Sequence, residues 1–119
     1  TKRTIVLDGD GAMLMQLGNV STIKKLNIKN FFHIIFNNNV HESTGGQPIS
    51  SINLDFRKVF SLFDYKKIYK IKTPTELDKI LKKKIKGPVG IYIKVNVGSI
   101  LNLPRQDRKS LLAFKKLIK

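Results

Sequence analysis

Apolar residues along this chain follow two patterns, which are short continuous runs and longer stretches with helical spacing. Two apolar runs, at 4–8 and 31–36, have the length of buried strands. The second run is almost free of polar residues, which is typical of a strand covered on both faces. A more exposed strand is expected at 66–72, where polar and apolar residues alternate, and a fourth strand is expected at 88–97.

Helical spacing follows each of these strands. One helix is expected over 12–26, and its inward face is formed by Met13, Leu14, Leu17, Val20 and Ile23. Further helices are expected at 53–63, 73–87 and 107–119. The helix at 73–87 has the clearest start, because a threonine cap is followed by proline and then, three residues after the cap, by glutamate, and a glycine ends it.

Strands and helices therefore alternate in the order β-α-β-α-β-α-β-α. This order predicts an α/β fold, in which residues 1–119 form one domain with a parallel sheet, helices on both faces and right-handed crossovers. A polar, glycine-containing loop at 37–51 interrupts the pattern, and its length predicts a functional role.

Composition narrows the class of protein. The chain has no cysteine, which excludes disulfides and thiolate metal sites and is typical of a reducing cytoplasm. No apolar run approaches the roughly 20 residues of a membrane span, so we expect no membrane partner. The formal net charge is +15, but lysines cluster on an expected helix face at 79–86 without interleaved aromatic residues. We therefore expect a solvated lysine face, and nucleic-acid binding is unlikely.

Unusual residues stand where the first two strands end. Gly-Asp-Gly follows the first strand at 9–11, Asn-Asn-Asn follows the second at 37–39, and 25 residues separate the two triplets. Ligands of an open parallel sheet bind beyond the carboxyl ends of its strands, so one crossover of this length would bring both triplets to the same edge. Carboxylate, amide and carbonyl oxygens suit Mg²⁺, and a helix that begins at about Ala12 would offer N–H groups to phosphate. The spacing predicts a metal and phosphate site.

Other interpretations of Asp-Gly-Asp-Gly at 8–11 fail on spacing. An EF-hand loop that begins at Asp8 requires glutamate where the chain has Asn19. A dinucleotide fingerprint that begins at Gly9 requires a glycine where the chain has Leu14, and no Walker A sequence occurs.

The residues also carry a resemblance to a known family. The sequence GDGAMLMQLGNVSTI at 9–23, followed at 25 residues by Asn-Asn, resembles the thiamine diphosphate motif of the decarboxylase and acetolactate synthase superfamily. The sequence HIIFNNNVHESTGGQ at 33–47 resembles, more specifically, the phosphonopyruvate decarboxylases of phosphonate biosynthesis. The similarity runs from about residue 4 to LPR at 103–105 and beyond. It implies a thiamine diphosphate-binding fold, of which the chain is a partial pyrophosphate domain.

The resemblance implies a ligand set. Asp10 and the side chain of Asn38 would bind Mg²⁺, with the backbone carbonyl of Val40 as a third ligand. Gly11 and Ala12 would face the diphosphate of the cofactor through their N–H groups.

Gly9 completes the expected cofactor contacts. Family patterns carry aspartate at the position of Asn37 and glutamate at that of Asn39, so this chain departs from them in charge near the substrate.

Polar side chains of the loop after the second strand are candidates for substrate contact. His41 lies three residues after Asn38, where it could orient an acidic group of the substrate, transfer a proton near neutral pH, or structure the loop. Ser43 and Thr44 are candidate contacts to a phosphonate or a diphosphate. His33 lies inside an apolar strand, so we expect it to be buried and hydrogen-bonded.

The implied activity is the thiamine diphosphate- and Mg²⁺-dependent decarboxylation of a 2-oxo acid, 3-phosphonopyruvate, to phosphonoacetaldehyde. This chain would supply the diphosphate and metal half of the site, and a pyrimidine-binding domain or subunit would supply the other half within a homo-oligomer. The chain begins at Thr1 and nothing in it corresponds to that domain, so we expect a fragment that is inactive alone. Two alternatives stay open, which are a sulfopyruvate decarboxylase subunit and a basic α/β binding module without catalysis.

Overall fold

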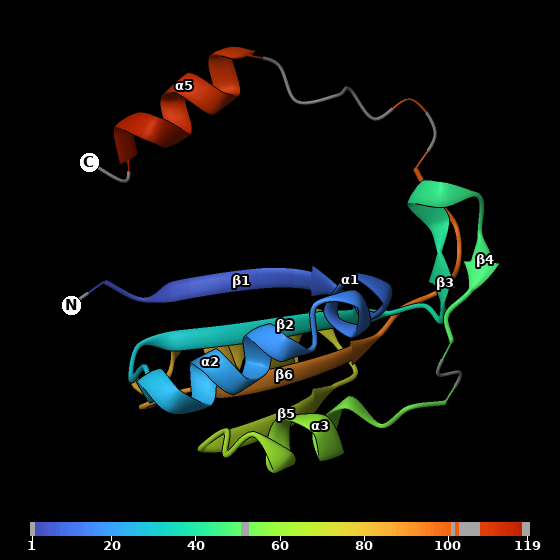
Figure 1. Cartoon of the computed structure of the whole chain (residues 1–119). Helices are drawn as coiled ribbons and strands as arrows, with labels where there is room; N and C mark the ends of the chain where they lie inside the picture. Colours follow the sequence, from blue (N-terminus) through green and yellow to red (C-terminus); the bar gives the residue numbers. More distant parts are fainter. Residues whose placement is uncertain (1, 51–52, 101, 103–107, 118–119) are drawn as a thin grey trace.

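A four-stranded parallel sheet forms the centre of the fold (Figure 1). The computed structural model describes residues 2–50, 53–100, 102 and 108–117. In order across the sheet, the strands are β1 (Thr4–Gly9), β2 (Phe31–Asn37), β6 (Val89–Lys94) and β5 (Lys67–Ile71). All three pairs of neighbouring strands are parallel, which confirms the predicted α/β class.

Helices connect these strands and cover both faces of the sheet. The connecting helices are α1 (Asp10–Met15), α2 (Gly18–Leu26), α3 (Phe56–Leu62) and α4 (Pro74–Lys82), and α5 (Arg108–Leu117) follows the last strand along the chain. The helices α1, α2 and α3 pack on one face, whereas α4 packs on the other. The expected helix at 107–119 corresponds to α5, and residues 107, 118 and 119 lie outside the described residues.

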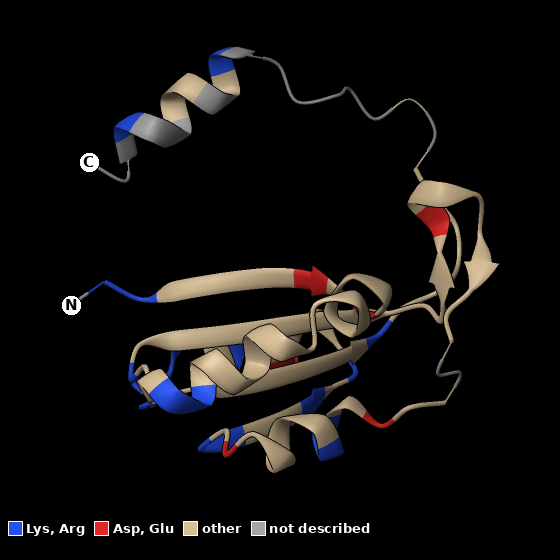
Figure 2. Ribbon diagram, viewed as in Figure 1, with Lys and Arg blue, Asp and Glu red and all other residues tan. Residues whose placement is uncertain are grey.

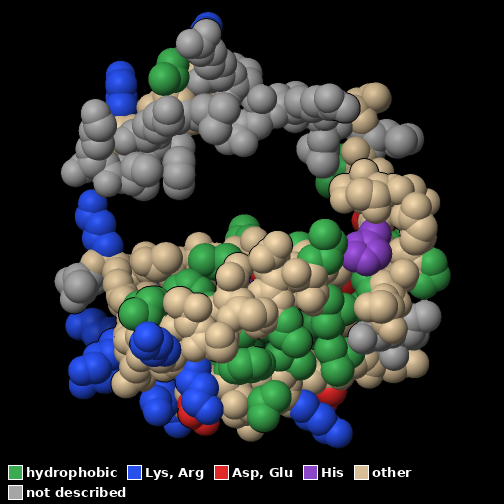
Figure 3. All heavy atoms as spheres, in the orientation of Figure 1, with side chains coloured by type: hydrophobic (Ala, Val, Ile, Leu, Met, Phe, Trp, Pro, Cys, Tyr) green, Lys and Arg blue, Asp and Glu red, His purple; other side chains and the backbone are tan. Residues whose placement is uncertain are grey.

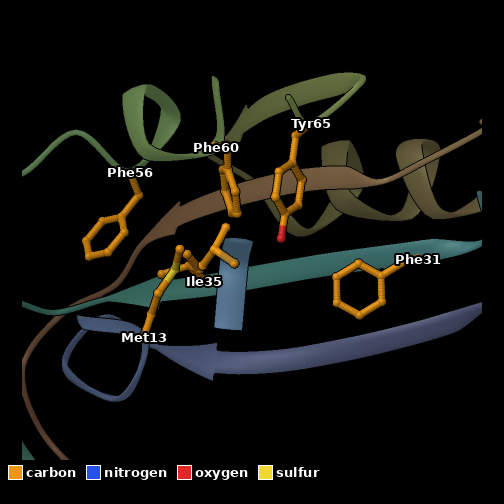
Figure 4. Close-up of a cluster of buried hydrophobic side chains, with 7 residues drawn as sticks. Met13, Phe31, Ile35, Phe56, Phe60 and Tyr65 are labelled. Carbon is orange, nitrogen blue, oxygen red and sulfur yellow. The ribbon is translucent and has the colours of Figure 1, made fainter. Parts of the chain in front are cut away.

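Each face of the sheet has its own apolar core. The first core, drawn in Figure 4, contains Met13, Val20, Phe31, Ile35, Phe56, Phe60 and Tyr65. The second contains Phe32, Ile34, Ile71, Ile80, Val89 and Ile91. Odd-numbered residues of β2 therefore face the first core and even-numbered ones face the second, because side chains alternate along a strand. This is why β2 is apolar along almost its whole length.

A short hairpin rises from the carboxyl edge of the sheet (Figure 1). The strands β3 (Val40–His41) and β4 (Gln47–Pro48) pair in antiparallel fashion around the 3₁₀ helix η1 (Glu42–Thr44). Gly45 and Gly46 close it with φ angles of 116° and 77°, which side chains disfavour. The loop expected at 37–51 is therefore ordered into a hairpin over most of its length.

The single helix expected at 12–26 is wrong in one respect, because the structure contains two helices. The N–H groups of Asn19 and Val20 donate to the carbonyls of Gln16 and Leu17, three residues back, so the α-helical ladder is interrupted there. Gly18 stands at this break, where its low helix propensity favours an interruption. As a result Leu17, expected on the inward face, is 36% exposed.

The expected burial of the first strand is also wrong. Ile5 and Leu7 are 44% and 66% exposed, although their sequence reads as a buried run. The strand β1 is at one edge of the sheet. On the second face, α4 packs against the other strands, β2, β6 and β5. Their neighbours in register, Phe32 and Ile34, are covered, so burial is decided here by the position of the strand in the sheet.

Capping confirms the predicted start of α4 but not its end. The hydroxyl of Thr73 accepts a hydrogen bond from the N–H of Glu76 at 3.2 Å, and the Glu76 carboxylate accepts one from the N–H of Lys72 at 2.8 Å. The helix ends at Lys82 rather than just before Gly87, because the backbone at Lys83 turns to an extended conformation.

Basic side chains gather mainly at the edge where the strands begin, as Figure 3 shows on its visible face, away from the hairpin. Of the helices in the described part of the chain, none combines the length and apolar character that crossing a membrane requires.

Candidate functional site

The two triplets singled out in the sequence meet at the carboxyl edge of the sheet. The strands β1 and β2 are parallel neighbours, with Gly9 in register with Phe36, so the residues that follow them emerge side by side. Contact is direct, because the N–H of Asn39 donates to Oδ2 of Asp10 at 2.7 Å across 29 residues of sequence. The predicted convergence is confirmed.

A cavity of about 450 Å³ opens at this edge. Eight residues expected at the site line it, namely Gly9, Asp10, Gly11, Ala12, Asn38, Val40, His41 and Ser43. Five further lining residues were not expected, namely Phe36, Glu42, Val95, Asn96 and Gly98. Thr44 does not line the cavity. Its hydroxyl lies 3.3 Å from the carbonyl of His41 and 3.3 Å from Oε1 of Gln47, so in this structure it joins the two strands of the hairpin.

Asp10 is the buried acid of the site. Its side chain is 2% exposed, and its two carboxylate oxygens each accept a backbone N–H, from Gly11 at 2.8 Å and from Asn39 at 2.7 Å. Each oxygen has a further lone pair that could face a cation. Asn39 holds its place with a φ of 64°, a left-handed conformation that asparagine tolerates better than most residues. The backbone of the triple asparagine therefore fixes the direction of the carboxylate.

Asn38 is held by both ends of its amide. Its Oδ1 accepts from the N–H of Val40 at 3.1 Å, and its Nδ2 donates to Oε2 of Glu42 at 3.0 Å. Glu42 Oε1 in turn accepts from the N–H of Gly98, in the segment after β6. Glu42 thus joins the Asn38 loop to a segment 56 residues away. Its role as a link was missed in the sequence, where the only signal was a carboxylate four residues after Asn38.

Gly11 and His41 are in close contact. A Cβ at Gly11 would lie 2.4 Å from Cε1 and 2.5 Å from Nδ1 of the His41 imidazole. The ring therefore lies directly over the first turn of α1, beside the backbone expected to face the diphosphate. Residue 11, the second residue of α1, must be glycine for the histidine to take this position.

The donor set fits Mg²⁺ and a diphosphate ligand. Among the described residues, no three His, Cys, Asp or Glu side chains cluster to hold a metal ion, so a cation here would depend on amide and carbonyl oxygens beside one carboxylate. The carbonyl of Val40 is a suitable third oxygen, because the ladder hydrogen bond beside the Val40–Pro48 pair joins the flanking residues Ile49 and Asn39, so the Val40 carbonyl points away from β4. Asp10, Asn38 and Val40 all line the same cavity.

His33 lies away from this cavity, as expected, and is buried in the first core. It is 4% exposed, with Nδ1 3.0 Å from the hydroxyl of Tyr65 and Nε2 3.3 Å from Oδ2 of Asp8. Burial lowers the pKa of His33 below its ordinary value, and the hydrogen bond and charge of Asp8 oppose this shift without overcoming it. Burial also raises the pKa of Tyr65, so its phenol stays protonated.

The fold and the site together define a class of protein. The family model described as "Thiamine pyrophosphate enzyme, C-terminal TPP binding domain" matches residues 1–95, which is most of the chain. The chain belongs to this family of thiamine pyrophosphate-binding domains.

Curated relatives narrow the similarity further. The chain is 31% identical over 103 residues to the phosphonopyruvate decarboxylase of Streptomyces viridochromogenes and 33% identical over 103 residues to that of Streptomyces hygroscopicus. Each match covers 85% of this chain and 26% of the relative. It is also 49% identical over 45 residues, 38% of the chain and 24% of the relative, to the sulfopyruvate decarboxylase subunit beta of Methanocaldococcus jannaschii. The chain thus spans about a quarter of the length of these relatives.

Proposed function

We propose that this chain is the diphosphate- and metal-binding part of a thiamine diphosphate-dependent carboxy-lyase that acts on a 2-oxo acid. The observation that carries the proposal is the meeting of Asp10, Asn38 and Val40 at one cavity, in a chain of the thiamine pyrophosphate-binding family. The substrate we propose is 3-phosphonopyruvate, supported by the similarity of 85% of the chain to two phosphonopyruvate decarboxylases.

Different residues of the chain would bind the metal ion and the diphosphate of the cofactor. Asp10 and the side chain of Asn38, with the carbonyl of Val40, would hold Mg²⁺, whose positive charge would favour binding of a diphosphate. Backbone at Gly11 and Ala12 would face those phosphates. When bound, thiamine diphosphate supplies the carbon nucleophile and the electron sink for the loss of CO₂.

Loop residues would act on the substrate side. His41 is held over Gly11 at the rim of the cavity, where its imidazole would orient an acidic group of the substrate or carry a proton. Ser43 lines the same cavity and would donate its hydroxyl to the phosphonate. Thr44 remains a candidate contact only if the hairpin rearranges, since its hydroxyl lies within hydrogen-bond distance of acceptors inside the loop.

A partner would complete the active site. The chain spans about a quarter of its phosphonopyruvate decarboxylase relatives, and another relative is named as a subunit beta. We propose that a pyrimidine-binding domain or subunit contributes the remaining part, within a homo-oligomer of the full enzyme. The 119-residue chain alone should then show no decarboxylation, and measurable turnover by it would overturn this point.

Calorimetric titration of thiamine diphosphate tests the site. The chain, combined with its pyrimidine-binding partner, should bind the cofactor in the presence of Mg²⁺ and at least tenfold more weakly without it. Asp10→Ala should abolish the Mg²⁺-dependent part of the binding. Asp78→Ala removes an exposed carboxylate on α4, paired with Lys82, and should leave cofactor affinity unchanged.

The outcome separates the competing functions. Metal-dependent binding that requires Asp10 supports the proposal, and turnover of phosphonopyruvate against sulfopyruvate then decides between the two substrates. Sulfopyruvate is the second candidate because of the 49% identity over 45 residues. Failure of the wild-type assembly to bind the cofactor would overturn the proposal and leave a basic module without catalysis.

A further inference from the structure

A second cavity, of about 240 Å³, lies at the same edge of the sheet as the candidate cofactor site. Its polar and charged lining residues are Asn37, Asn39, Asn53, Asp55, Arg57, Lys70, Tyr92 and Lys94. Alternate residues of one segment separate the two cavities, because 37 and 39 line the second cavity whereas 38 and 40 line the first. The second cavity is therefore a neighbouring space with its own lining.

The second cavity has an excess of positive charge. Arg57 is neutralised locally, since its Nε and one terminal nitrogen donate to the two oxygens of Asp55 at 2.9 and 2.7 Å. This leaves Lys70 on β5 and Lys94 on β6, neither of which has a carboxylate partner among the described residues. Figure 2 shows basic positions on β5 and at the end of β6. Among the described residues, Asp55 is the one carboxylate that lines the cavity, and Arg57 offsets its charge, so the two lysines leave a net positive charge that favours an anionic ligand.

Strand register holds these groups together. Lys94 of β6 is paired in register with Asn37 of β2, and Lys70 of β5 is paired with Tyr92 of β6. Tyr92 and Lys94 are two residues apart on β6. Side chains two residues apart on a strand, and those of register partners, lie on the same face of a sheet. The two lysines, the phenol and the Asn37 amide therefore share one face, on strands of a rigid parallel sheet.

Tyr92 is placed as a neutral hydrogen-bond donor. Its ring stacks on Phe56, with centroids 6.2 Å apart and planes inclined by 20°. Burial, and then the charge of Asp55, raises the pKa of Tyr92 above its ordinary value, although Arg57 opposes the shift. The hydroxyl is thus available to donate to an anion at neutral pH.

Two amides at the cavity have unused acceptors. Among the described residues, the buried Oδ1 atoms of Asn37 and Asn39 accept no hydrogen bond, and the Asn37 side chain is 2% exposed. A buried acceptor without a donor costs free energy, so it favours a ligand that brings one. Sulfate has no O–H group, whereas hydrogen phosphate combines two negative charges with one O–H donor.

We infer that the second cavity is a binding site for hydrogen phosphate, a dianion that still has one O–H donor at neutral pH, held by Lys70, Lys94 and Tyr92. The anionic oxygens lie against the two ammonium groups and the phenol, and the O–H donates to an asparagine amide oxygen. The site does not depend on thiamine diphosphate, because its residues differ from those of the cofactor cavity.

Titration with inorganic phosphate, followed residue by residue in amide NMR spectra of the 119-residue chain, tests this inference. Saturable shifts are expected at 37, 39, 70, 92 and 94, and sulfate at equal ionic strength should bind more weakly. Lys70→Met with Lys94→Met should remove these shifts, and each single Lys→Gln variant should weaken phosphate binding about tenfold. A small phosphate monoester, which at neutral pH is mainly a dianion without an O–H group, should bind more weakly than phosphate, and equal affinity of the two would overturn the assignment to hydrogen phosphate.

The matched control is Lys66→Met with Lys67→Met, which removes the same charge at the opposite end of β5. This variant should bind phosphate as the unmodified chain does. Shifts confined to Gly11, Ala12 and His41 would mean that phosphate occupies only the cofactor cavity. Equal losses in the two double variants would mean non-specific attraction to lysines, and either result would overturn the inference. If the Lys70/Lys94 double variant unfolds, the two single variants decide in the same way.

Discussion

The His41 imidazole lies so close to Gly11 that a Cβ on residue 11 would fall 2.4 Å from the ring. This contact joins the hairpin after β2 to the first turn after β1. Two segments that are 30 positions apart in the chain therefore share one surface of the cavity. Glycine at this position is therefore required by a side chain of the other segment.

Gly11→Ala should displace His41 and weaken thiamine diphosphate binding in the assembled enzyme. We expect the affinity to fall at least tenfold, because the added methyl and the imidazole cannot occupy the same space. His41→Ala combined with Gly11→Ala should restore the melting temperature of the single His41→Ala variant, because the steric conflict is removed. Equal loss of stability from Gly11→Ala in the two backgrounds would contradict a direct contact.

Glu42→Gln should loosen the loop that we propose holds the metal. The two carboxylate oxygens of Glu42 accept hydrogen bonds from Nδ2 of Asn38 and from the N–H of Gly98. The amide nitrogen of a glutamine is a donor, so it would face one of these two donors and one hydrogen bond would be lost. We expect Mg²⁺-dependent cofactor binding to weaken about tenfold, with the melting temperature nearly unchanged because Glu42 is exposed. Calorimetry with Asp78→Asn, which removes the same charge from α4, provides the control and should match the unmodified chain.

Protonation of His33 should destabilise the fold in mild acid. Its pKa is lowered in the folded state by burial, so below its ordinary value of 6.5 the unfolded chain binds more protons. The contribution of neutral His33 to the free energy of unfolding is complete above pH 6.5. It is lost as the pH falls toward the pKa of His33 in the folded state, by at most about 1.4 kcal/mol per pH unit.

Urea unfolding between pH 5 and pH 8 measures this dependence. His33→Gln should remove this contribution to the slope while leaving the slopes that come from carboxylates. Parallel curves for the two proteins below pH 6.5 would show that His33 does not titrate differently in the folded state.

Gly90→Ala should destabilise the first core. A Cβ at residue 90 of β6 would lie 2.5 Å from Cγ of Phe60, whose side chain is fully buried. Overpacking of this kind costs about 1–3 kcal/mol, measurable by chemical denaturation. Gly18→Ala is the control, since nothing lies within 4 Å of its Cβ position and alanine favours the helix. Phe60→Leu in the Gly90→Ala background should recover part of the loss, and strictly additive losses would refute the overlap.

Much of the fold could be predicted from local patterns. The apolar run of β2, the threonine cap of α4 and the alternation of strands with helices each depend on neighbours in sequence, and each is confirmed. The boundaries were harder, because the break between α1 and α2 lies beside Gly18, and an isolated glycine lowers helix propensity without always ending a helix. The exposure of β1 depends on its place at the sheet edge, which no run of apolar residues encodes.

The sequence by itself determined that Asp10 and the triple asparagine would meet, because consecutive parallel strands deliver their carboxyl ends to the same edge. Only the tertiary structure decided which side chains complete that edge. Glu42 reaches Gly98 across 56 residues, and Lys70 and Lys94 share a cavity because β5 and β6 are neighbours. Strand order and the direction of each side chain are set by packing across the whole sheet, so contacts of this kind have no local signal in the sequence.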